Sequence, residues 1–323
     1  MTERRLIEML ADGGVHSGRD LGESLGISRA AIWKQLQKLE DRGISVESVR
    51  GRGYRIPGGL DLLSHARITG LLHGEVRGAI SRVEVHDELA STNSYLMEQR
   101  HSSDFHGLVC LAERQIQGRG RRGRSWVSPY GRNLYLSIGW NFENGAAVVE
   151  GLSLAVGVAV RRAVVAATGS DACRLKWPND ILLGGKKLGG ILVEMQGDPS
   201  DLCQLVIGVG LNVGMSGTDA APIDQPWADV TEMGPVSRNR LTAGLLAQII
   251  PLLAKFPATG FREYREEWQA NDALRDQAVT LATPSRQIGG RAAGVADNGA
   301  LQLEINGQVQ EFSGGEISLR GAQ

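Results

Sequence analysis

The sequence is short of cysteine, has no long apolar run and carries no excess of one charge. Its three cysteines, Cys110, Cys173 and Cys203, are odd in number and never paired as CxxC. They therefore predict neither a disulfide framework nor a zinc site, which fits a reducing cytosol. No run of 18 or more apolar residues is present, so neither a membrane-spanning helix nor a membrane partner is expected. The first ten residues hold four charged side chains and no apolar stretch, so no secretory signal is expected and the protein is expected to be cytoplasmic.

Composition sets the scale of the molecule. With 323 residues, of which 42% are hydrophobic and 22% charged, the chain has the composition of a globular protein rather than a disordered one. At roughly 150 residues per domain, this length predicts about two domains with room for a small third. The 35 Lys and Arg residues balance 36 Asp and Glu residues, and glycine is abundant at 43 residues. A net charge so close to zero can hide local asymmetry.

Charge is unevenly distributed in the first 55 residues. Residues 1–25 hold three basic and five acidic side chains, whereas residues 26–55 hold seven basic and three acidic ones. A local basic excess is the usual electrostatic footprint of phosphate contact, although the neutral total argues against broad affinity for nucleic acid.

The same segment has the pattern of three short helices and a hairpin. Ser17 and Ser28 are expected N-caps, and Gly26 and Gly43 are expected helix ends. This order, followed by the basic tip Arg50-Gly51-Arg52, is typical of a winged helix-turn-helix, whose second helix reads the major groove. The residues expected to contact DNA are Ser28, Arg29, Trp33, Lys34, Gln37, Lys38, Arg50 and Arg52. The alternatives are a solvated basic face or a protein-interaction module, and Trp33 could either stack on DNA or pack the hairpin.

Residues 118–123 read Gly-Arg-Gly-Arg-Arg-Gly, which matches the dinucleotide-binding pattern G-x-G-x-x-G. That pattern requires a helix to open within it, but Pro129 and Gly131 prevent a long helix here, so we reject the dinucleotide interpretation. The five arginines between residues 114 and 124 can instead bring guanidinium and backbone N–H groups to polyanionic phosphate. Such a loop is expected to be disordered alone and ordered by its ligand. The alternative is a solvated or nucleic-acid-binding segment.

A set of motifs, taken in order, resembles the biotin–protein ligase family. The set is Ser91-Thr92-Asn93, Gln115 with Gly118–Arg124, Lys176-Trp177-Pro178-Asn179-Asp180, Lys187–Glu194 and Gly208–Asn212. With the helix-turn-helix in front and Gly314–Arg320 at the end, the chain is similar to bifunctional ligases that also repress biotin operons. The resemblance covers nearly the whole chain, and the ordered set is far more specific than any single motif.

The resemblance implies an ATP-dependent ligase. Such an enzyme joins the carboxylate of biotin to the α-phosphate of ATP, releases pyrophosphate, and transfers the biotinoyl group to a lysine of a biotin carboxyl-carrier domain. The barrier is largely electrostatic, so well-placed cations are the main catalytic device and no protein nucleophile is needed. The resemblance also implies Mg²⁺ with ATP, operator DNA as a partner and a homodimer when biotinoyl-AMP is bound. No compact carboxylate cluster announces a metal site in the sequence.

The resemblance also assigns roles to particular residues. Arg119, Arg121 and Lys187 are expected to be catalytic by carrying the negative charge of the carboxylate and α-phosphate. The residues expected to bind biotin are Ser91, Thr92, Asn93, Gln115, Arg119, Gly120, Arg121, Lys187, Gly190 and Gly208. Those expected to bind ATP are Arg122, Arg124, Trp126, Asn179, Asn212 and Arg320. Gly120 is expected to let its backbone N–H approach the ligand.

Several of these residues have a structural explanation as well. Ser91 can begin a helix as its N-cap, and Asn179 can belong to a turn. Trp126 can pack on adenine or merely seal the loop. Lys187 can be a solvated hairpin lysine, and Arg320 a solvated terminal arginine.

The pattern as a whole predicts an α+β protein of three parts. These are a winged helix-turn-helix over residues 1–59, a central mixed sheet with backing helices over residues 60–271, and a small SH3-like β-barrel over residues 272–323. Leu152–Ala167 and Leu241–Phe256 are the clearest helices. In the last part, turns are expected at Gly289-Gly290, Asp297-Asn298-Gly299 and Asn306-Gly307.

Three other functions remain open at this point. A ligand-sensing repressor without catalysis would keep the DNA-binding module and the biotin pocket. A lipoate–protein ligase would share the fold and the adenylate chemistry, although the glycine–arginine motif favours biotin. A DNA-binding module fused to an unrelated enzyme would not carry the ordered motifs.

Overall fold

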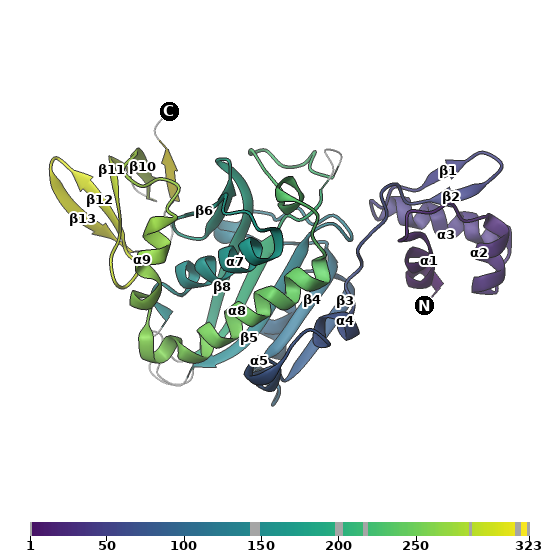
Figure 1. Cartoon of the computed structure of the whole chain (residues 1–323), viewed down its shortest axis with the longest axis horizontal. Helices are drawn as coiled ribbons and strands as arrows, with labels where there is room; N and C mark the ends of the chain where they lie inside the picture. The colour runs from purple at the N-terminus through teal and green to yellow at the C-terminus, as the bar shows by residue number, and fades with distance from the viewer. Residues whose placement is uncertain are drawn as a thin grey trace.

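The computed structural model has three parts that follow one another along the chain. It describes residues 2–142, 149–197, 203–215, 219–283, 286–313 and 318–321. A helical module at the N-terminus and a small sheet at the C-terminus lie at opposite ends of a central sheet that is covered by helices (Figure 1). The predicted α+β class, with its order of parts, is confirmed.

The N-terminal module contains the predicted helix-turn-helix and wing. Its elements are α1 (Thr2–Leu10), α2 (Gly18–Leu25), α3 (Arg29–Asp41), β1 (Glu47–Val49) and β2 (Gly53–Arg55). Ser17 and Ser28 cap α2 and α3 by accepting hydrogen bonds from backbone N–H groups three residues later, as predicted. Gly26 follows α2 in the left-handed conformation with φ 67°, which glycine adopts at little cost. These caps set the sharp angle between α2 and α3.

This module docks on the edge of the central sheet through one aromatic side chain and several ion pairs. Tyr130, which belongs to the central part, is buried in the same cluster as the core of the module. The Arg4 guanidinium lies 3.2 Å from Asp87 Oδ1, and that of Arg42 lies 2.7 Å from Asp87 Oδ2. The orientation of the helix-turn-helix is therefore tied to the strand that carries Asp87.

The central sheet has seven strands in the order β3-β4-β5-β9-β8-β7-β6. Only β3 and β4 run parallel, and the other neighbours pair antiparallel, which makes the sheet mixed as predicted. The strands are β3 (Arg82–Leu89), β4 (Leu108–Gln115), β5 (Leu134–Phe142), β6 (Cys173–Lys176), β7 (Asp180–Leu183), β8 (Lys186–Gly197) and β9 (Cys203–Leu211). The helices of this part are α4 (His65–Thr69), α5 (Gly74–Ala79), α6 (Thr92–Glu98), α7 (Leu152–Thr168), α8 (Arg238–Thr259) and α9 (Arg262–Ala270).

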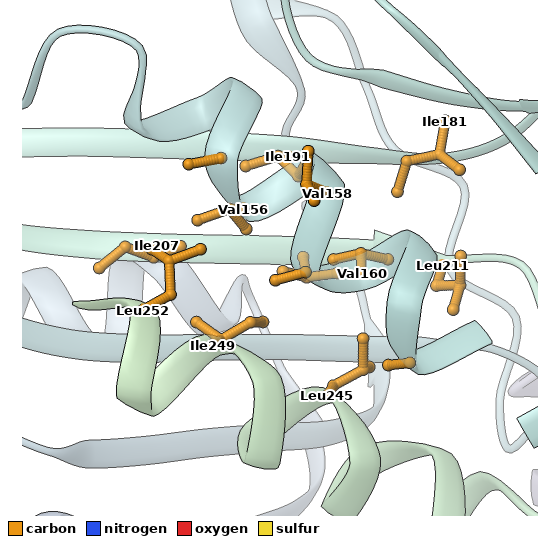
Figure 2. Packing of buried hydrophobic residues seen from close by; sticks show 14 of the residues in the cluster. Val156, Val158, Val160, Ile181, Ile191, Ile207, Leu211, Leu245, Ile249 and Leu252 are labelled. Atoms are coloured by element: carbon orange, nitrogen blue, oxygen red, sulfur yellow. The ribbon is translucent and has the colours of Figure 1, made fainter. Parts of the chain in front are cut away.

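The two faces of the sheet have different chemistry because side chains alternate along a strand. On one face, Ile207 and Leu211 of β9 pack against Val160 of α7 and Ile249 of α8 in one buried cluster (Figure 2). The other face of β9 carries Val206, which packs with α6 in a separate small cluster, followed by the two glycines at 208 and 210. One face of the sheet thus holds the core, and the other is left open beyond α6.

Helix α8 is long and carries a buried apolar face. By length and composition it could cross a membrane, with 22 residues and a mean hydropathy of 1.5 over its most apolar window. Its buried side chains include Leu245, Ile249 and Leu252, and they face α7 and the sheet (Figure 2). A core helix passes the same test, so this is weak evidence for a membrane span.

The C-terminal part is a five-stranded antiparallel sheet in the order β13-β12-β11-β10-β14, the SH3-like unit. Its strands are β10 (Ala278–Ala282), β11 (Gln287–Val295), β12 (Leu301–Ile305), β13 (Gln308–Phe312) and β14 (Ser318–Gly321). The predicted turns at 297–299 and 306–307 are confirmed. The turn predicted at Gly289-Gly290 is wrong, because both glycines lie inside β11 and pair with β10. In that strand, a Cβ on Gly290 would approach the backbone oxygen of Glu304 to 3.0 Å, so close strand packing rather than a turn explains this glycine.

All three cysteines are unpaired and buried in the central part. Burial raises the pKa of each thiol, to about 11 for Cys173. Neutral buried thiols are poor nucleophiles and poor metal ligands, so Cys110, Cys173 and Cys203 have a packing role.

Candidate functional site

A cleft of about 840 Å³ opens on the face of the central sheet opposite α7 and α8. It lies between the C-terminal ends of β3 and β4, the strands β5, β8 and β9, and the glycine–arginine loop, which we define as residues 116–127. Fourteen of the residues predicted to bind biotin or ATP line it: Ser91, Thr92, Asn93, Gln115, Arg119, Gly120, Arg121, Arg122, Arg124, Trp126, Asn179, Lys187, Gly190 and Gly208. Segments that are up to 117 residues apart in the sequence therefore meet in one site.

Two glycines of β9 create the space at the floor of the cleft. A Cβ on Gly208 would lie 2.3 Å from Asn93 Oδ1, and a Cβ on Gly210 would lie 2.7 Å from Cε2 of Trp126. Neither distance is sterically possible without displacement. A side chain at either position would push a predicted ligand-binding residue out of place. Gly189, by contrast, is required by the approach of β8 to the Gly210 backbone oxygen, at 2.8 Å from its Cβ position.

Four polar residues form one wall of the cleft, which we call the polar wall: Thr92, Asn93, Gln115 and Ser137. The Thr92 backbone N–H and hydroxyl both donate to Gln115 Oε1, at 2.9 and 3.1 Å. The Ser137 hydroxyl lies 2.7 Å from Thr92 Oγ1 and 2.6 Å from Asn93 Oδ1. Because a hydroxyl has a single proton, it can donate to only one of these at a time. The polar wall therefore keeps acceptor capacity that a ureido ring could use.

Ser91 has the structural role that the sequence allowed. It is the N-cap of α6, and its hydroxyl accepts a hydrogen bond from the Ser94 backbone N–H. This cap starts α6 directly after β3, which places the next two residues against β5 and β9. Ser91 is 4% exposed and lines the cleft, so the two explanations are compatible.

The glycine–arginine loop is a hairpin that closes over the cleft. The Trp126 N–H donates to the Gly118 carbonyl at 2.8 Å, and the Gly120 N–H donates to the Arg124 carbonyl at 2.7 Å. The loop itself uses the Gly120 N–H here, and the expectation that Gly120 lets a backbone N–H approach the ligand stays a prediction. At the tip, Arg122 has φ 59°, which is costly for a residue with a side chain and keeps the turn tight.

The arginines of the loop divide between two ends of the cleft. Arg119 lies against the polar wall, where its Nη2 is 3.0 Å from Glu194 Oε2. Arg121 reaches the other end, where its Nη1 is 3.4 Å from Asn179 Oδ1. Burial lowers the pKa of Arg121, but an arginine with a lowered pKa is still fully charged at neutral pH. Arg122 and Arg124 are exposed at the rim.

Lys187 is held in the cleft beside Arg121. Its ammonium lies 2.7 Å from Asp180 Oδ1 and 5.6 Å from the centroid of the Trp126 ring. The neighbouring Lys186 is exposed, on the strand that follows the Gly184-Gly185 turn. Alternation along β8 therefore separates the two lysines, so that only Lys187 faces the site.

Asn179, Asn212 and Arg320 have more constrained positions than the sequence suggested. The Asn179 amide donates to the Ile191 carbonyl at 2.8 Å, which leaves its oxygen facing the cleft. The Asn212 amide donates to two backbone carbonyls, at 3.1 and 3.3 Å. It is 4% exposed and borders a smaller pocket of about 70 Å³ next to the cleft. The backbone of Arg320 pairs with that of Thr280, whereas its side chain and residues 314–317 lie outside the described residues.

Sequence reasoning gave no role to five residues that line or support the cleft: Ser137, Lys176, Glu194, Asp224 and Gln225. Ser137 and Glu194 stand out in hindsight as polar residues on strands that are otherwise apolar. No sequence pattern predicts a role for Asp224 and Gln225, because the loop that brings them to the cleft has no regular periodicity of apolar residues.

The DNA-contact residues predicted on the N-terminal module are all exposed. They are Ser28, Arg29, Trp33, Lys34, Gln37 and Lys38 around α3, and Arg50 and Arg52 on the wing. Trp33 is 55% exposed, so it does not pack the hairpin. An aromatic ring that stands among cations on the outer face of a recognition helix is suited to contact with sugar or base.

The cleft has the features of a site for activating an anion. Its described lining contains no His or Cys, and no group of three or more His, Cys, Asp or Glu that could hold a metal ion occurs among the described residues. It does combine a small polar wall with arginines and a lysine that converge from two segments. Such a site stabilises negative charge and positions two reactants, and it does not attack either of them.

Comparison with known proteins agrees with this chemistry. The biotin/lipoate A/B protein ligase family matches residues 86–212, a helix-turn-helix domain matches residues 2–55, and the biotin protein ligase C-terminal domain matches residues 276–320. The chain is 42% identical over 320 residues to the bifunctional ligase/repressor BirA of Escherichia coli, which covers 99% of this chain and 97% of that protein. It is 31% identical over 241 residues to the biotin–[acetyl-CoA-carboxylase] ligase of Mycobacterium tuberculosis, which covers 73% and 88%. The solved biotin protein ligase of Aquifex aeolicus in complex with biotin and ATP is 28% identical with a TM-score of 0.64, over 75% of this chain and 99% of that one.

Fold, cleft and similarity together define the class: the chain belongs to the biotin–protein ligase family. Within the family it is of the bifunctional ligase/repressor type, because the similarity to the Escherichia coli protein runs without interruption from the helix-turn-helix to the C-terminal sheet.

Proposed function

We propose that the cleft joins the carboxylate of biotin to the α-phosphate of ATP and then passes the biotinoyl group to a lysine of a biotin carboxyl-carrier domain. One observation carries this proposal: Arg119, Arg121 and Lys187 bring three cations to a single cleft, with Arg119 at the polar wall and Arg121 at the end nearer Asn179. In the first step a carboxylate oxygen bonds to the α-phosphorus, and the bond to pyrophosphate breaks. Both reactants are anions, so positive charge at the meeting point lowers the barrier most.

Biotin occupies the end of the cleft above Gly208 in this proposal. Its bicyclic ring lies beside the Asn93 side chain, which fills the space over Gly208, and its ureido group meets Thr92, Asn93 and Gln115. A urea has two donors and one strong acceptor, which must all be paired once they are buried. The Asn93 oxygen, which points over Gly208, supplies an acceptor, and the Gln115 amide, 3.3 Å from Ser128 Oγ, is a nearby donor.

ATP occupies the end of the cleft nearer Asn179. Arg121 and Lys187 are the cations that reach the meeting point, while Arg122 and Arg124 at the rim face the pyrophosphate that leaves. Trp126 lies between Gly210 and Lys187, where an adenine ring could pack on it. Its indole Nε1 is buried and has no hydrogen-bond partner in the described residues, so a ligand acceptor would satisfy it.

Mg²⁺ fits this site only when it binds together with the phosphates of ATP. The cleft offers two carboxylates, Asp180 and Asp224, together with the free side of the Asn179 oxygen. A magnesium ion usually takes one or two carboxylates and completes its shell with phosphates and water. Asp180 and Asn179 are therefore the residues that would hold it, and the ion would neutralise phosphate charge there.

The enzymatic proposal is tested by incubation of the protein with biotin, MgATP and a biotin carboxyl-carrier domain. Mass spectrometry should find biotin linked to one lysine of that domain. Arg121→Ala should release biotinoyl-AMP faster, whereas Arg291→Ala, in the C-terminal sheet, should not. A wild-type protein that binds biotin but yields no product would favour the alternative of a biotin-sensing repressor without catalysis. Product with lipoate but not with biotin would favour the lipoate-type ligase.

The repressor function rests on the exposed cationic face of α3 and the wing. We infer that the protein binds operator DNA as a homodimer once biotinoyl-AMP fills the cleft, because a single small module binds DNA weakly. Sedimentation with and without biotin and ATP should show an increase in mass towards a dimer. An unchanged mass would count against coupled dimerisation. Trp33→Ala should weaken DNA binding without slowing biotinylation.

The division into residues 1–59, 60–271 and 272–323 stays a prediction, as does the cytoplasmic location. Two clusters of buried side chains support the first boundary: one holds residues 6–56 together with Tyr130, and the other begins at Leu63. The buried thiols agree with a reducing compartment. Separate expression of residues 60–323 would test whether the ligase folds without the DNA-binding module.

A further inference from the structure

We propose that Glu194 is a positioning residue that fixes the polarity of the biotin pocket and anchors the glycine–arginine loop to it. This inference rests on the proposed function, since it concerns the place where biotin is expected to bind. Glu194 lies on β8, in register with Val206 of β9, and its side chain is 26% exposed. It is on the same face of the sheet as Gly208 and the polar wall.

A single oxygen of this carboxylate receives two hydrogen bonds. Glu194 Oε2 accepts from Asn93 Nδ2 at 2.8 Å and from Arg119 Nη2 at 3.0 Å. One donor belongs to the polar wall and the other to the loop. The two segments are 26 residues apart in the sequence and meet at this oxygen.

The first hydrogen bond decides how the Asn93 amide is oriented. An Asn side chain presents NH₂ on one side and C=O on the other, and only its partners determine which is which. Here the NH₂ is held by Glu194 and by the Leu192 carbonyl, at 3.2 Å. Oδ1 therefore points away from Glu194 and over Gly208, where the Ser137 hydroxyl lies 2.6 Å from it and where a ureido N–H could donate to its second lone pair. Glu194 thus sets an acceptor at the position where biotin needs one.

The second hydrogen bond closes a continuous path from the end of the loop to its start. The path runs through the polar wall, and successive polar atoms along it lie 3.3 Å or less apart, although the Ser137 hydroxyl donates to Thr92 or to Asn93 and not to both at once. In order, it joins the Trp126 carbonyl, Ser128, Gln115, Thr92, Ser137, Asn93, Glu194 and Arg119. Both ends of the loop are therefore attached to the surface that contacts biotin, and Glu194 is the last link.

A carboxylate suits this position because both partners are donors and one of them, Arg119, is a cation. A glutamine oxygen in the place of Oε2 could still accept from both donors, but it would carry no negative charge for Arg119, and in the flipped orientation its NH₂ would face both donors. Loss of a charged hydrogen bond costs more than loss of a neutral one. The substitution keeps the size of the side chain, so it removes the negative charge and leaves the packing unchanged.

The experiment compares wild type with E194Q. Biotin affinity should fall about 10- to 100-fold by calorimetry, with KM for biotin rising in parallel and KM for ATP and the midpoint of urea unfolding unchanged. Trypsin should cut the native loop after its arginines faster in E194Q than in wild type. A merely structural role would instead lower the unfolding midpoint and change both KM values together, and that result would overturn the proposal.

A double-mutant cycle and a matched control sharpen the test. If Glu194 anchors Arg119, the combined E194Q/R119A variant should lose less affinity than the product of the two single losses, because both remove one interaction. Fully multiplicative losses would overturn the anchoring of the loop. The control is E304Q, which breaks a carboxylate–arginine pair of similar exposure with Arg291 in the C-terminal sheet and should leave biotin binding unchanged.

The outcomes for this proposal and for the ligase proposal are separate. Wild-type protein that binds biotin without forming product would remove the ligase proposal, and the affinity of E194Q would still test the role of Glu194. Conversely, E194Q that binds biotin as tightly as wild type would overturn the role of Glu194 and leave the ligase proposal intact.

Discussion

The guanidinium of Arg42, at the C-terminal end of the recognition helix, lies 2.7 Å from the carboxylate of Asp87 on the edge strand of the catalytic sheet. Asp87 lies five residues before Thr92, the first residue of the polar wall. The same carboxylate receives hydrogen bonds from Arg4 and Tyr130. DNA-binding helices and biotin pocket are therefore attached to the same short stretch of chain.

Replacement of Arg42 by Ala should loosen the DNA-binding module. The ion pair is about one quarter exposed, so the expected loss is only about 0.5–1.5 kcal/mol of docking free energy. Limited proteolysis at residues 56–62 should become faster, as measured by the rate of release of the N-terminal module. The control is Arg55→Ala, which breaks a pair with Glu47 inside the module and should leave cleavage at the junction unchanged.

The effect of Arg42→Ala should depend on pH in a defined direction. Burial raises the pKa of Asp87, but hydrogen bonds from Tyr130, Arg42 and Arg4 outweigh burial, so the pKa is below its ordinary value of 3.8. A carboxylate with a lowered pKa contributes stability above its ordinary pKa and loses it as the pH falls through the folded value. The difference between variant and wild type should therefore be full at pH 7 and disappear in acid. A difference that persists at pH 2 would contradict this assignment.

Glu113 is the acidic partner whose loss should be most costly. Its carboxylate is fully buried, lies 2.8 Å from the guanidinium of the equally buried Arg238, and accepts from the Leu63 N–H at 2.7 Å. Glu113→Gln leaves a buried cation without its counter-charge, so the free energy of unfolding should fall by about 3–5 kcal/mol. Urea unfolding measures this change. The control is Glu311→Gln, which makes the same change at an exposed carboxylate. A similar fall in the free energy of unfolding there would refute the role of the buried ion pair.

Lys187 and Lys186 form a natural pair of test and control. Lys187→Ala removes a cation from the meeting point of the two anions, so the rate of biotinoyl-AMP formation should fall about 10²–10³-fold. Lys186→Ala should leave that rate within about twofold. Single-turnover release of labelled pyrophosphate reports the step directly. Equal rates for the two variants would exclude Lys187 from the reaction.

Gly208→Ala should abolish biotin binding without unfolding the protein. The new methyl group would lie 2.3 Å from Asn93 Oδ1. The Asn93 side chain must therefore move out of the space over Gly208. Calorimetry should show at least a 100-fold loss of biotin affinity, about 2.7 kcal/mol. Gly289→Ala, in a strand position with open space around its Cβ, controls for the general effect of Gly→Ala on a strand.

Asp272, at the junction with the C-terminal sheet, should make stability depend on pH in the opposite sense from Asp87. Burial raises its pKa from 3.8 to about 6. Between these values the folded chain binds more protons than the unfolded chain, so the free energy of unfolding falls as the pH rises through this window. Asp272→Asn should flatten that slope, as seen in thermal midpoints between pH 4 and pH 7. An unchanged slope would show that other groups dominate.

Much of the fold could be predicted from the sequence because its signals are local. Ser17 and Ser28 predict helix starts because they are N-caps, and Asn306-Gly307 predicts a hairpin. Capping and tight turns depend only on nearby residues. Gly289-Gly290 was misread as a turn because the same residue also serves close strand packing. Only the paired strand distinguishes the two uses.

The candidate site was predictable as a set of motifs but not as a geometry. The sequence named Arg119 and Arg121 together, yet it could not show that they serve opposite ends of the cleft. Nor could it show that the Gly120 N–H donates a hydrogen bond to the Arg124 carbonyl within the loop. Ser137 and Glu194 received no role because their function depends on which residue stands opposite them on the neighbouring strand, and pairing between distant strands is not a local property.

The burial of all three cysteines has a practical consequence for experiments on this protein. Thiols that are inaccessible and protonated do not react with maleimides in the native state, so the wild-type chain is in effect a cysteine-free background. A cysteine placed at the exposed position of Arg122 would be the single site to take a dye. Its fluorescence would then report closure of the loop over biotin in real time, with no need to remove the native residues first.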